Sequence, residues 1–320
     1  MLHNKNSIIA LVVVLLILAT YIALCVGSHT ISLIDLFFNT APQNYEIVVN
    51  IRLPRVINAI TVGALLSIAG LMVQNLVKNP LADPYILGLS GASAAAQLAL
   101  ISFGIVLPFW VFSTIGFSAA IFSLIVLLTI SSKKAINTSN LLLSGVVMAF
   151  AYGALISLLL TISPLASTKP MLFWLMGDLS HSSFSYFSIS MLFLGVFWSF
   201  RYHKELDILA RGEFFAQKCG VDTKKINSSL LITTAVFTAI AVSMAGTIGF
   251  VGLVVPHLAR LLVGNNHAQL IPLSALIGSL LLLIADTLAR TIVAPIQLPV
   301  GIFTAFFGVP VFILLLRRGL

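Results

Sequence analysis

Charged side chains are scarce in this 320-residue sequence. Asp, Glu, Lys and Arg make up 8% of the residues, whereas hydrophobic residues make up 59% and mean hydropathy is +1.12. An ordinary soluble chain carries about 25% charged residues, which it needs to cover its surface. The composition therefore excludes a soluble enzyme, a nucleic-acid binder and a disordered protein. It predicts an all-α polytopic membrane protein.

Cysteine is also scarce, since Cys25 and Cys219 are the two cysteines of the sequence. The predicted spans place them on opposite sides of the membrane, which excludes a disulfide framework. No metal-ligand spacing occurs either, so no metal site is expected.

Catalytic motifs are missing, and the sequence has nine acidic residues. Asp286 alone among these falls clearly inside an apolar stretch, whereas membrane enzymes usually cluster ionisable residues at membrane depth. There is no HExxH motif and no serine nucleophile elbow with candidate partners. A catalytic site is therefore not expected. Because no GxxxxGK[ST] loop occurs, ATP-driven transport would need an ATPase on another polypeptide.

Long apolar stretches are what the sequence has in abundance. A spanning helix needs about 20 apolar residues, and no small-x-small cleavage site follows the first stretch, so we interpret it as a retained span. Together the stretches form a single domain over 1–320, and an even number puts both termini on one side. The ten predicted spans are about 8–27, 56–76, 88–104, 109–131, 140–162, 184–200, 229–247, 250–264, 271–289 and 301–316.

The basic residues favour cytoplasmic termini. In that orientation four of the 17 basic residues fall outside, and the remaining 13 fall on the cytoplasmic side, as the positive-inside rule requires. The net charge of +8 is therefore interpreted as a signal of orientation rather than of an anionic partner. The four outer residues are Arg52, Arg55, Lys169 and Arg290.

A short motif that occurs twice in the sequence predicts an inverted repeat. Ser67-Ile-Ala-Gly70 resembles Ser243-Met-Ala-Gly246, and Pro80 and Pro256 follow at the same spacing. The copies begin in the second and seventh spans, which would run in opposite directions, as in many transporters. A chance match of small residues in apolar helices is the competing explanation.

Asp286 stands four residues before Arg290, so both lie on one helix face in the favourable order for an ion pair. We expect a structural pair near the outer end of the ninth span. The alternative is a stand-alone secondary carrier that uses Asp286 as its coupling site.

The longest inside segment, 201–227, predicts two short amphipathic helices at the membrane face. Leucines and phenylalanines alternate there with charges, and Gly212 and Gly220 break the segment. Such a segment suits either docking of a partner or contact with lipid headgroups.

Five motifs follow one another along the chain: Ile51-Arg-Leu-Pro-Arg55, Asn79-Pro-Leu-Ala-Asp-Pro84, Trp174-Leu-Met-Gly177, Gly249-Phe-Val-Gly-Leu-Val-Val-Pro-His257 and Leu298-Pro-Val-Gly301. Together they resemble the permease family of bacterial ABC importers for iron chelates, haem and vitamin B12. The resemblance covers nearly the whole chain in order.

The resemblance implies a homodimer of ten-span subunits in the bacterial cytoplasmic (inner) membrane. It also implies two ABC ATPase subunits below, which use ATP and Mg²⁺, and a periplasmic or extracellular substrate-binding protein outside. The chain itself is expected to bind no cofactor. The coupling segment seated in the ATPase would contain Arg211, Gly212, Glu213, Gly220 and Val221.

Two outer arginines of the family face acids of the binding protein, and the matching positions are Arg52 and Arg290. A guanidinium suits a carboxylate well. The alternative for Arg52 is interfacial snorkelling, and for Arg290 it is the pair with Asp286.

In the vitamin B12 permease a cytoplasmic gate is formed at positions that match Asn79, Leu81, Thr138 and Ser139. Asn-Pro and Thr-Ser are also ordinary turn and N-cap residues, which is the alternative role. The Thr-Ser match and the short chain favour vitamin B12 as cargo, but no residue here selects among an iron chelate, haem and cobalamin.

Overall fold

A computed structural model describes residues 5–27, 30–31, 42–131, 138–180 and 186–317. Within these ranges the elements are helices joined by loops, and no strand is present. Six helices are long and apolar enough to span a membrane, and four more are apolar but shorter. The six are α1 (Lys5–Cys25), α4 (Leu53–Val77), α6 (Phe109–Ser131), α7 (Thr138–Ile162), α12 (Thr223–Ala245) and α14 (His267–Thr291).

The four shorter apolar helices account for the remaining predicted spans, so each of the ten stretches corresponds, to within a few residues and over its described part, to one helix. They are α5 (Leu89–Ser102), α9 (Tyr186–Phe200), α13 (Val251–Val263) and α15 (Val300–Arg317). Small elements complete the described chain: α3 (Pro42–Ile47), the π-helical turn η1 (Val48–Arg52), the 3-10 turn η2 (Pro84–Leu87), α8 (Leu165–Leu175), α10 (His203–Leu209) and α11 (Glu213–Lys218).

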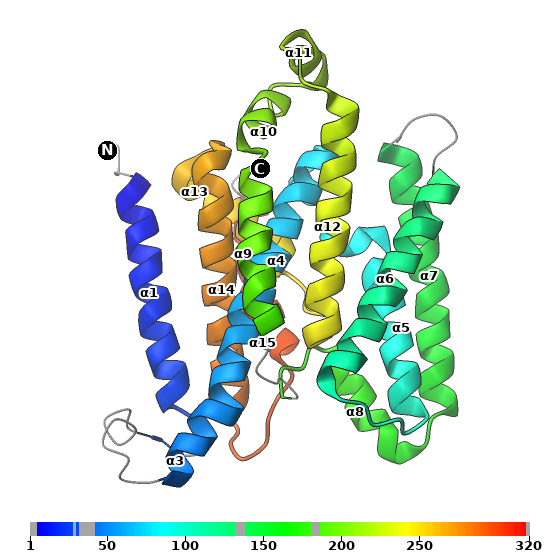
Figure 1. Cartoon of the computed structure of the whole chain (residues 1–320), viewed down its shortest axis with the longest axis vertical. Helices are drawn as coiled ribbons and strands as arrows, with labels where there is room; N and C mark the ends of the chain where they lie inside the picture. The colour runs from blue at the N-terminus through cyan, green and yellow to red at the C-terminus, as the bar shows by residue number, and fades with distance from the viewer. Residues whose placement is uncertain (1–4, 28–29, 32–41, 132–137, 181–185, 318–320) are drawn as a thin grey trace.

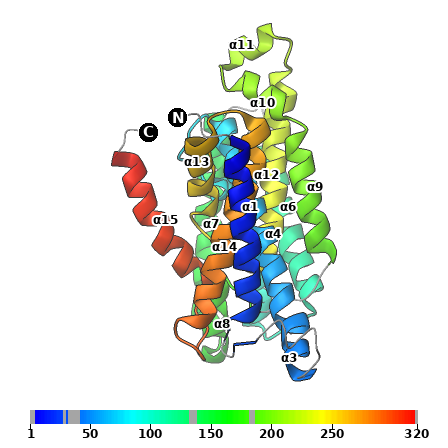
Figure 2. The same ribbon diagram turned by 90° about the vertical axis from the view of Figure 1, so that its left-hand side faces the viewer.

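The helices form an upright bundle with two distinct ends (Figure 1). One end carries α3 and α8, and we call it the α3 end; the opposite end carries α10 and α11, and we call it the α11 end. Helix α1 begins and α15 ends near the α11 end (Figure 2). The two described chain ends therefore lie on one side of the bundle. Lys133, Lys134 and Arg318 lie outside the described residues.

Helix α4 forms the centre of the bundle. In the most apolar stretch of the helical run 43–77, which contains α4, 89% of the residues are buried. The corresponding shares are 11% for α1 and 17% for α7. Glycines allow its close packing, because a Cβ atom built on Gly70 would lie 1.8 Å from the carbonyl oxygen of Gly252 on α13. Small residues at such crossings let backbones approach within a membrane, where packing rather than water exclusion drives association.

The two copies of the repeated motif begin on antiparallel helices, but their residues do not take equivalent places. Helices α4 and α12 run in opposite senses (Figure 1). However, Gly70 lies inside α4, whereas Gly246 is the C-cap residue that follows the end of α12. Similarly, Pro80 lies in a loop and Pro256 lies inside α13. The repeated motif, whose two copies are 176 residues apart, therefore does not mark structurally equivalent glycines or prolines.

Candidate functional site

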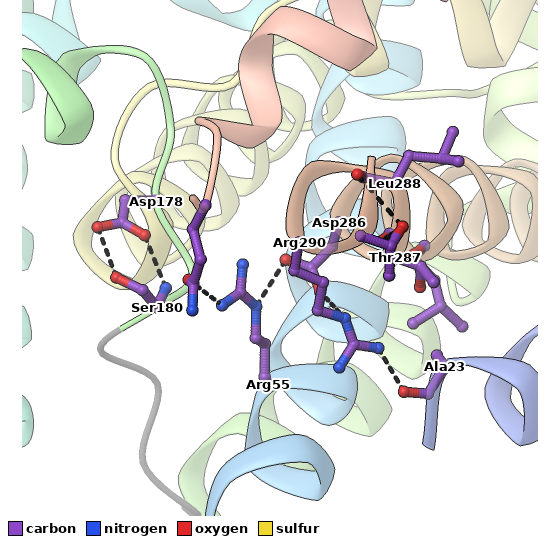
Figure 3. A network of polar contacts seen from close by, with 11 residues as sticks. Ala23, Arg55, Asp178, Ser180, Asp286, Thr287, Leu288 and Arg290 are labelled. Atoms are coloured by element: carbon purple, nitrogen blue, oxygen red, sulfur yellow. Dashed lines mark hydrogen bonds and ion pairs between the residues drawn. The ribbon is translucent and has the colours of Figure 1, made fainter. Parts of the chain in front are cut away.

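A buried carboxylate lies among arginines at the α3 end (Figure 3). Asp286 on α14 is 0% exposed, and its Oδ1 accepts a 2.8 Å hydrogen bond from Arg55 Nε. Arg55 lies in the first turn of α4, and its Nη1 donates to Gln297 Oε1 at 2.8 Å in the loop before α15. This network ties the start of α4 to α14 and to the loop that follows it.

The predicted ion pair between Asp286 and Arg290 is present but loose. Arg290 Nε lies 3.8 Å from Asp286 Oδ2, and neither atom has a hydrogen-bond partner among the described residues. The sequence did not predict Arg55 as the close partner of Asp286. Helical spacing reveals only pairs that are near in the chain, and Arg55 is 231 residues away from Asp286. The available signal was the second arginine of the IRLPR motif on the same predicted side of the membrane.

Arg52 and Arg290 lie inside the protein and hold the end of α1. Arg52 Nη1 donates to the carbonyl oxygens of Leu24 and Cys25, each at 2.7 Å, and Arg290 Nη2 donates to that of Ala23. The last carbonyls of a helix lack partners within the helix, so two guanidiniums cap α1. The two residues are 5% and 8% exposed, which leaves little of either at the surface.

The three arginines share one recess at the α3 end, with a volume of about 270 Å³. Arg52, Arg55, Arg290 and Gln297 line it, together with Gly27, Ile47, Ile51 and Pro295. Asp286 is the acid that the described residues place against these arginines. Three guanidiniums therefore line one recess at the α3 end.

The segment predicted to couple to an ATPase projects beyond the bundle as two short helices, α10 and α11 (Figures 1 and 2). Gly212 has a φ of +115°, a backbone angle that residues with a side chain rarely adopt. This glycine therefore allows the sharp turn between the two helices. Helix α11 begins at Glu213 and exposes Phe214 (72%) and Phe215 (42%). Arg211 and Gly220 flank α11, and the Val221 N–H donates to the carbonyl of Ala216 at 3.0 Å.

Two polar contacts attach this segment to the bundle. The carboxylate of Asp207 on α10 lies 2.7 Å from His267 Nδ1 and accepts the His267 backbone N–H at 2.9 Å. Lys78 Nζ, at the end of α4, donates to Glu213 Oε2 at 2.9 Å. The first contact is partly buried, since the His267 side chain is 1% and that of Asp207 37% exposed, whereas the second is exposed. The segment is therefore connected to both α4 and α14.

The predicted gate residues come from two places at the α11 end. Asn79 and Leu81 share one turn, in which Asn79 Oδ1 accepts the Leu81 backbone N–H at 2.9 Å. Thr138 and Ser139 begin α7, and Ser139 is exposed. In the same loop as Asn79, burial raises the pKa of Asp83 to about 6, although its carboxylate accepts the N–H of Tyr85.

Over the described residues, ten apolar helices with a projecting helical pair at one end and buried charges at the other form the layout of a polytopic membrane protein. The comparisons give the family. Residues 15–318 match the FecCD transport family, and the chain belongs to that family.

Relatives and a solved structure agree with this assignment. The chain is 38% identical to the hemin transport system permease HmuU of Yersinia pestis, over 95% of this chain and 94% of that protein. It is 33% identical to the vitamin B12 import permease BtuC of Vibrio vulnificus, over 98% and 95%. A transporter described as of the metal-chelate ABC type, in an inward-facing conformation, matches with a TM-score of 0.86 and 29% identity over 98% of this chain and 99% of that one.

The family and these relatives define the class of this chain. It is a multi-pass transport permease of an ABC importer, in which ATP is hydrolysed by a separate subunit. This excludes the stand-alone carrier, because an ABC permease does not use a titrating carboxylate such as Asp286 as its source of energy.

Proposed function

We propose that this chain is the membrane-spanning subunit through which a bacterial importer carries an iron chelate, haem or cobalamin across the cytoplasmic membrane. It would act as a homodimer with two ATPase subunits on the side of α11 and a substrate-binding protein on the side of α3. The observation that carries the proposal is the FecCD fold with a projecting helical pair at one end and an arginine-lined recess at the other.

The coupling role is assigned to Arg211, Gly212, Glu213, Gly220 and Val221. Exposed aromatic residues on a short projecting helix are anchors of the kind that protein interfaces use, and α11 exposes Phe214 and Phe215. Because the segment is bonded to α4 and α14, movement of an ATPase that holds α11 would pass into the bundle.

The docking role is assigned to Arg52 and Arg290, which would receive acids of the binding protein in the recess at the α3 end. Their positive charge supports this role, whereas their burial and their bonds to α1 mean that docking must compete with the cap on that helix. The gate is assigned to Asn79, Leu81, Thr138 and Ser139, which would meet their copies across the dimer axis.

The basic residues support the orientation, with the α11 end and both termini in the cytoplasm. Lys78, Lys218, Lys224 and Lys225 lie at or near that end, whereas Lys169 lies on α8 at the other. Anionic lipids and the membrane potential retain lysine and arginine on the cytoplasmic side.

The decisive experiment is uptake into vesicles that contain this chain, its ATPase and its binding protein. Labelled cobalamin, haem and a ferric chelate are offered separately. Each is tested with and without ATP on the side of the membrane that carries the ATPase. We expect ATP-dependent uptake of one cargo, and its loss together with loss of the bound ATPase in Gly212→Pro. Uptake that persists without the ATPase would refute the proposal.

A further inference from the structure

A polar recess lies at the base of α10 and α11. Its volume is about 350 Å³, and four parts of the chain meet around it: the end of α4, the link between α10 and α11, the end of α13 and the start of α14. The residues that carry the inference are Gln74, Lys78, Arg260, Asn265 and His267.

The recess has positive walls and no carboxylate among its lining residues. Lys78 and Arg260 contribute charge, and Lys78 is already paired with Glu213. Arg260 is half-buried, and its Nη1 donates to the neutral Gln74 Oε1 at 2.7 Å, while the described residues offer it no ion pair. A guanidinium withdrawn from water is normally compensated by an acid.

The surrounding contacts fix the direction of this guanidinium. Gln74 Nε2 donates to the carbonyl of Leu253 at 3.1 Å, so its Oε1 is free to receive Arg260. His267 is 1% exposed, and its Nδ1 is used by Asp207 while its Nε2 has no hydrogen-bond partner within the described ranges. The recess thus holds an uncompensated arginine beside a buried imidazole with an unused nitrogen.

These features select an anion over other occupants. Two fixed cations disfavour a metal ion, and an apolar group would leave the guanidinium without a partner. The recess borders the segment whose next helix exposes Phe214 and Phe215. Apolar anchors beside a positive notch fit a protein partner that carries an apolar cleft and an acidic side chain next to it.

We propose that the recess receives a carboxylate side chain of the ATPase subunit, which pairs with Arg260 while α11 is seated in that subunit. The inference rests on the proposed function and adds a second, charged contact to the aromatic one. It also places the partner's acid beside Lys78 and Asn79, which line the same recess.

The test measures binding of the cognate ATPase to the detergent-solubilised permease over a series of salt concentrations. Arg260→Gln should weaken binding by about thirtyfold or more and flatten the dependence on salt, because one member of a desolvated charge pair is lost. Arg260→Lys should recover part of the affinity. Lys5→Gln, which removes an exposed charge at the start of α1 near the same end but outside the 201–227 segment, is the matched control and should change the affinity little.

Neutralising the acids of the ATPase one at a time then identifies the partner. The expected result is one acid whose loss is not additive with Arg260→Gln. Unchanged affinity of Arg260→Gln for the ATPase would overturn the inference. It would also fail if inorganic phosphate stabilised the permease alone while Arg260→Gln bound the ATPase as tightly as wild type. If the wild-type permease binds no ATPase, the proposed function itself fails.

Discussion

At the residue scale, Asp286 determines whether the charges at the α3 end can stay buried. Its carboxylate serves both Arg55 and Arg290, so it neutralises part of a cluster that would otherwise repel itself. The same geometry explains an acid at membrane depth without any role in proton transfer. Asp286 thus lies against two arginines, the predicted Arg290 at 3.8 Å and the closer Arg55 at 2.8 Å.

Replacing Asp286 by Asn should destabilise the protein strongly while leaving the pH dependence of uptake unchanged. Removal of one partner from a buried pair costs about 3–5 kcal/mol, because the remaining charge is left uncompensated. A lower melting temperature in detergent, compared with wild type and with the exposed control Glu46→Gln, checks the first point. A shifted pH profile at intact stability would instead indicate that Asp286 titrates during transport.

Asp83, beside the predicted gate, should give the protein a dependence on pH of unusual sign. Burial raises its pKa from an ordinary value near 4 to about 6, so between these values the folded state binds more protons than the unfolded state. The contribution of Asp83 to stability is therefore present at low pH and is lost as pH rises through about 6. Melting curves at pH 4 to 7 should show this slope in wild type and a flatter one in Asp83→Asn, which keeps an acceptor for Tyr85. Equal slopes in wild type and Asp83→Asn would disprove this contribution of Asp83.

At the element scale, the packing of α4 depends on residues without side chains. Gly70 should not tolerate alanine, because the added methyl group would overlap the backbone of Gly252. We expect a loss of about 1–3 kcal/mol, the usual cost of overpacking, measured as a lower melting temperature. Gly153→Ala on α7 is the control, since nothing lies within 4 Å of the added atom there. Equal effects of both variants would show that helix propensity, not the contact, decides the outcome.

The link between Lys78 and Glu213 joins α4 to α11 and should affect coupling more than stability. An exposed pair contributes at most about 1 kcal/mol to folding, so Lys78→Glu and Glu213→Lys should melt nearly as wild type. Each reversal should lower ATP-driven uptake, because like charges then push α11 away from the gate turn. The double variant should restore uptake. A double variant no better than either single one would rule out this connection.

At the scale of the whole molecule, the two native cysteines report its orientation. Cys25 ends α1 at the α3 end, and Cys219 is exposed just after α11 at the opposite end. With Cys25→Ser, a thiol reagent that cannot cross membranes should label Cys219 from the cytoplasmic side alone. With Cys219→Ser, the remaining Cys25 should react from the outside or not at all. The reverse pattern would invert the proposed orientation.

The sequence alone determined the class and the layout of this protein. Scarcity of charge forced the chain into a membrane, and the lengths of apolar stretches fixed ten helices, because both signals are local and average over many residues. Gly212 and Gly220 likewise marked the limits of α11, since backbone angles are a local property. Family motifs located the candidate sites but not the contacts within them.

Only the tertiary structure decided which charges meet. The pairing of Arg55 with Asp286, the capping of α1 by Arg52 and Arg290, and the contact between Lys78 and Glu213 all join residues that are far apart in the chain. A long side chain can reach many partners, and packing of the helices selects among them. For the same reason the lone guanidinium of Arg260 became apparent only after four segments had been brought together around one recess.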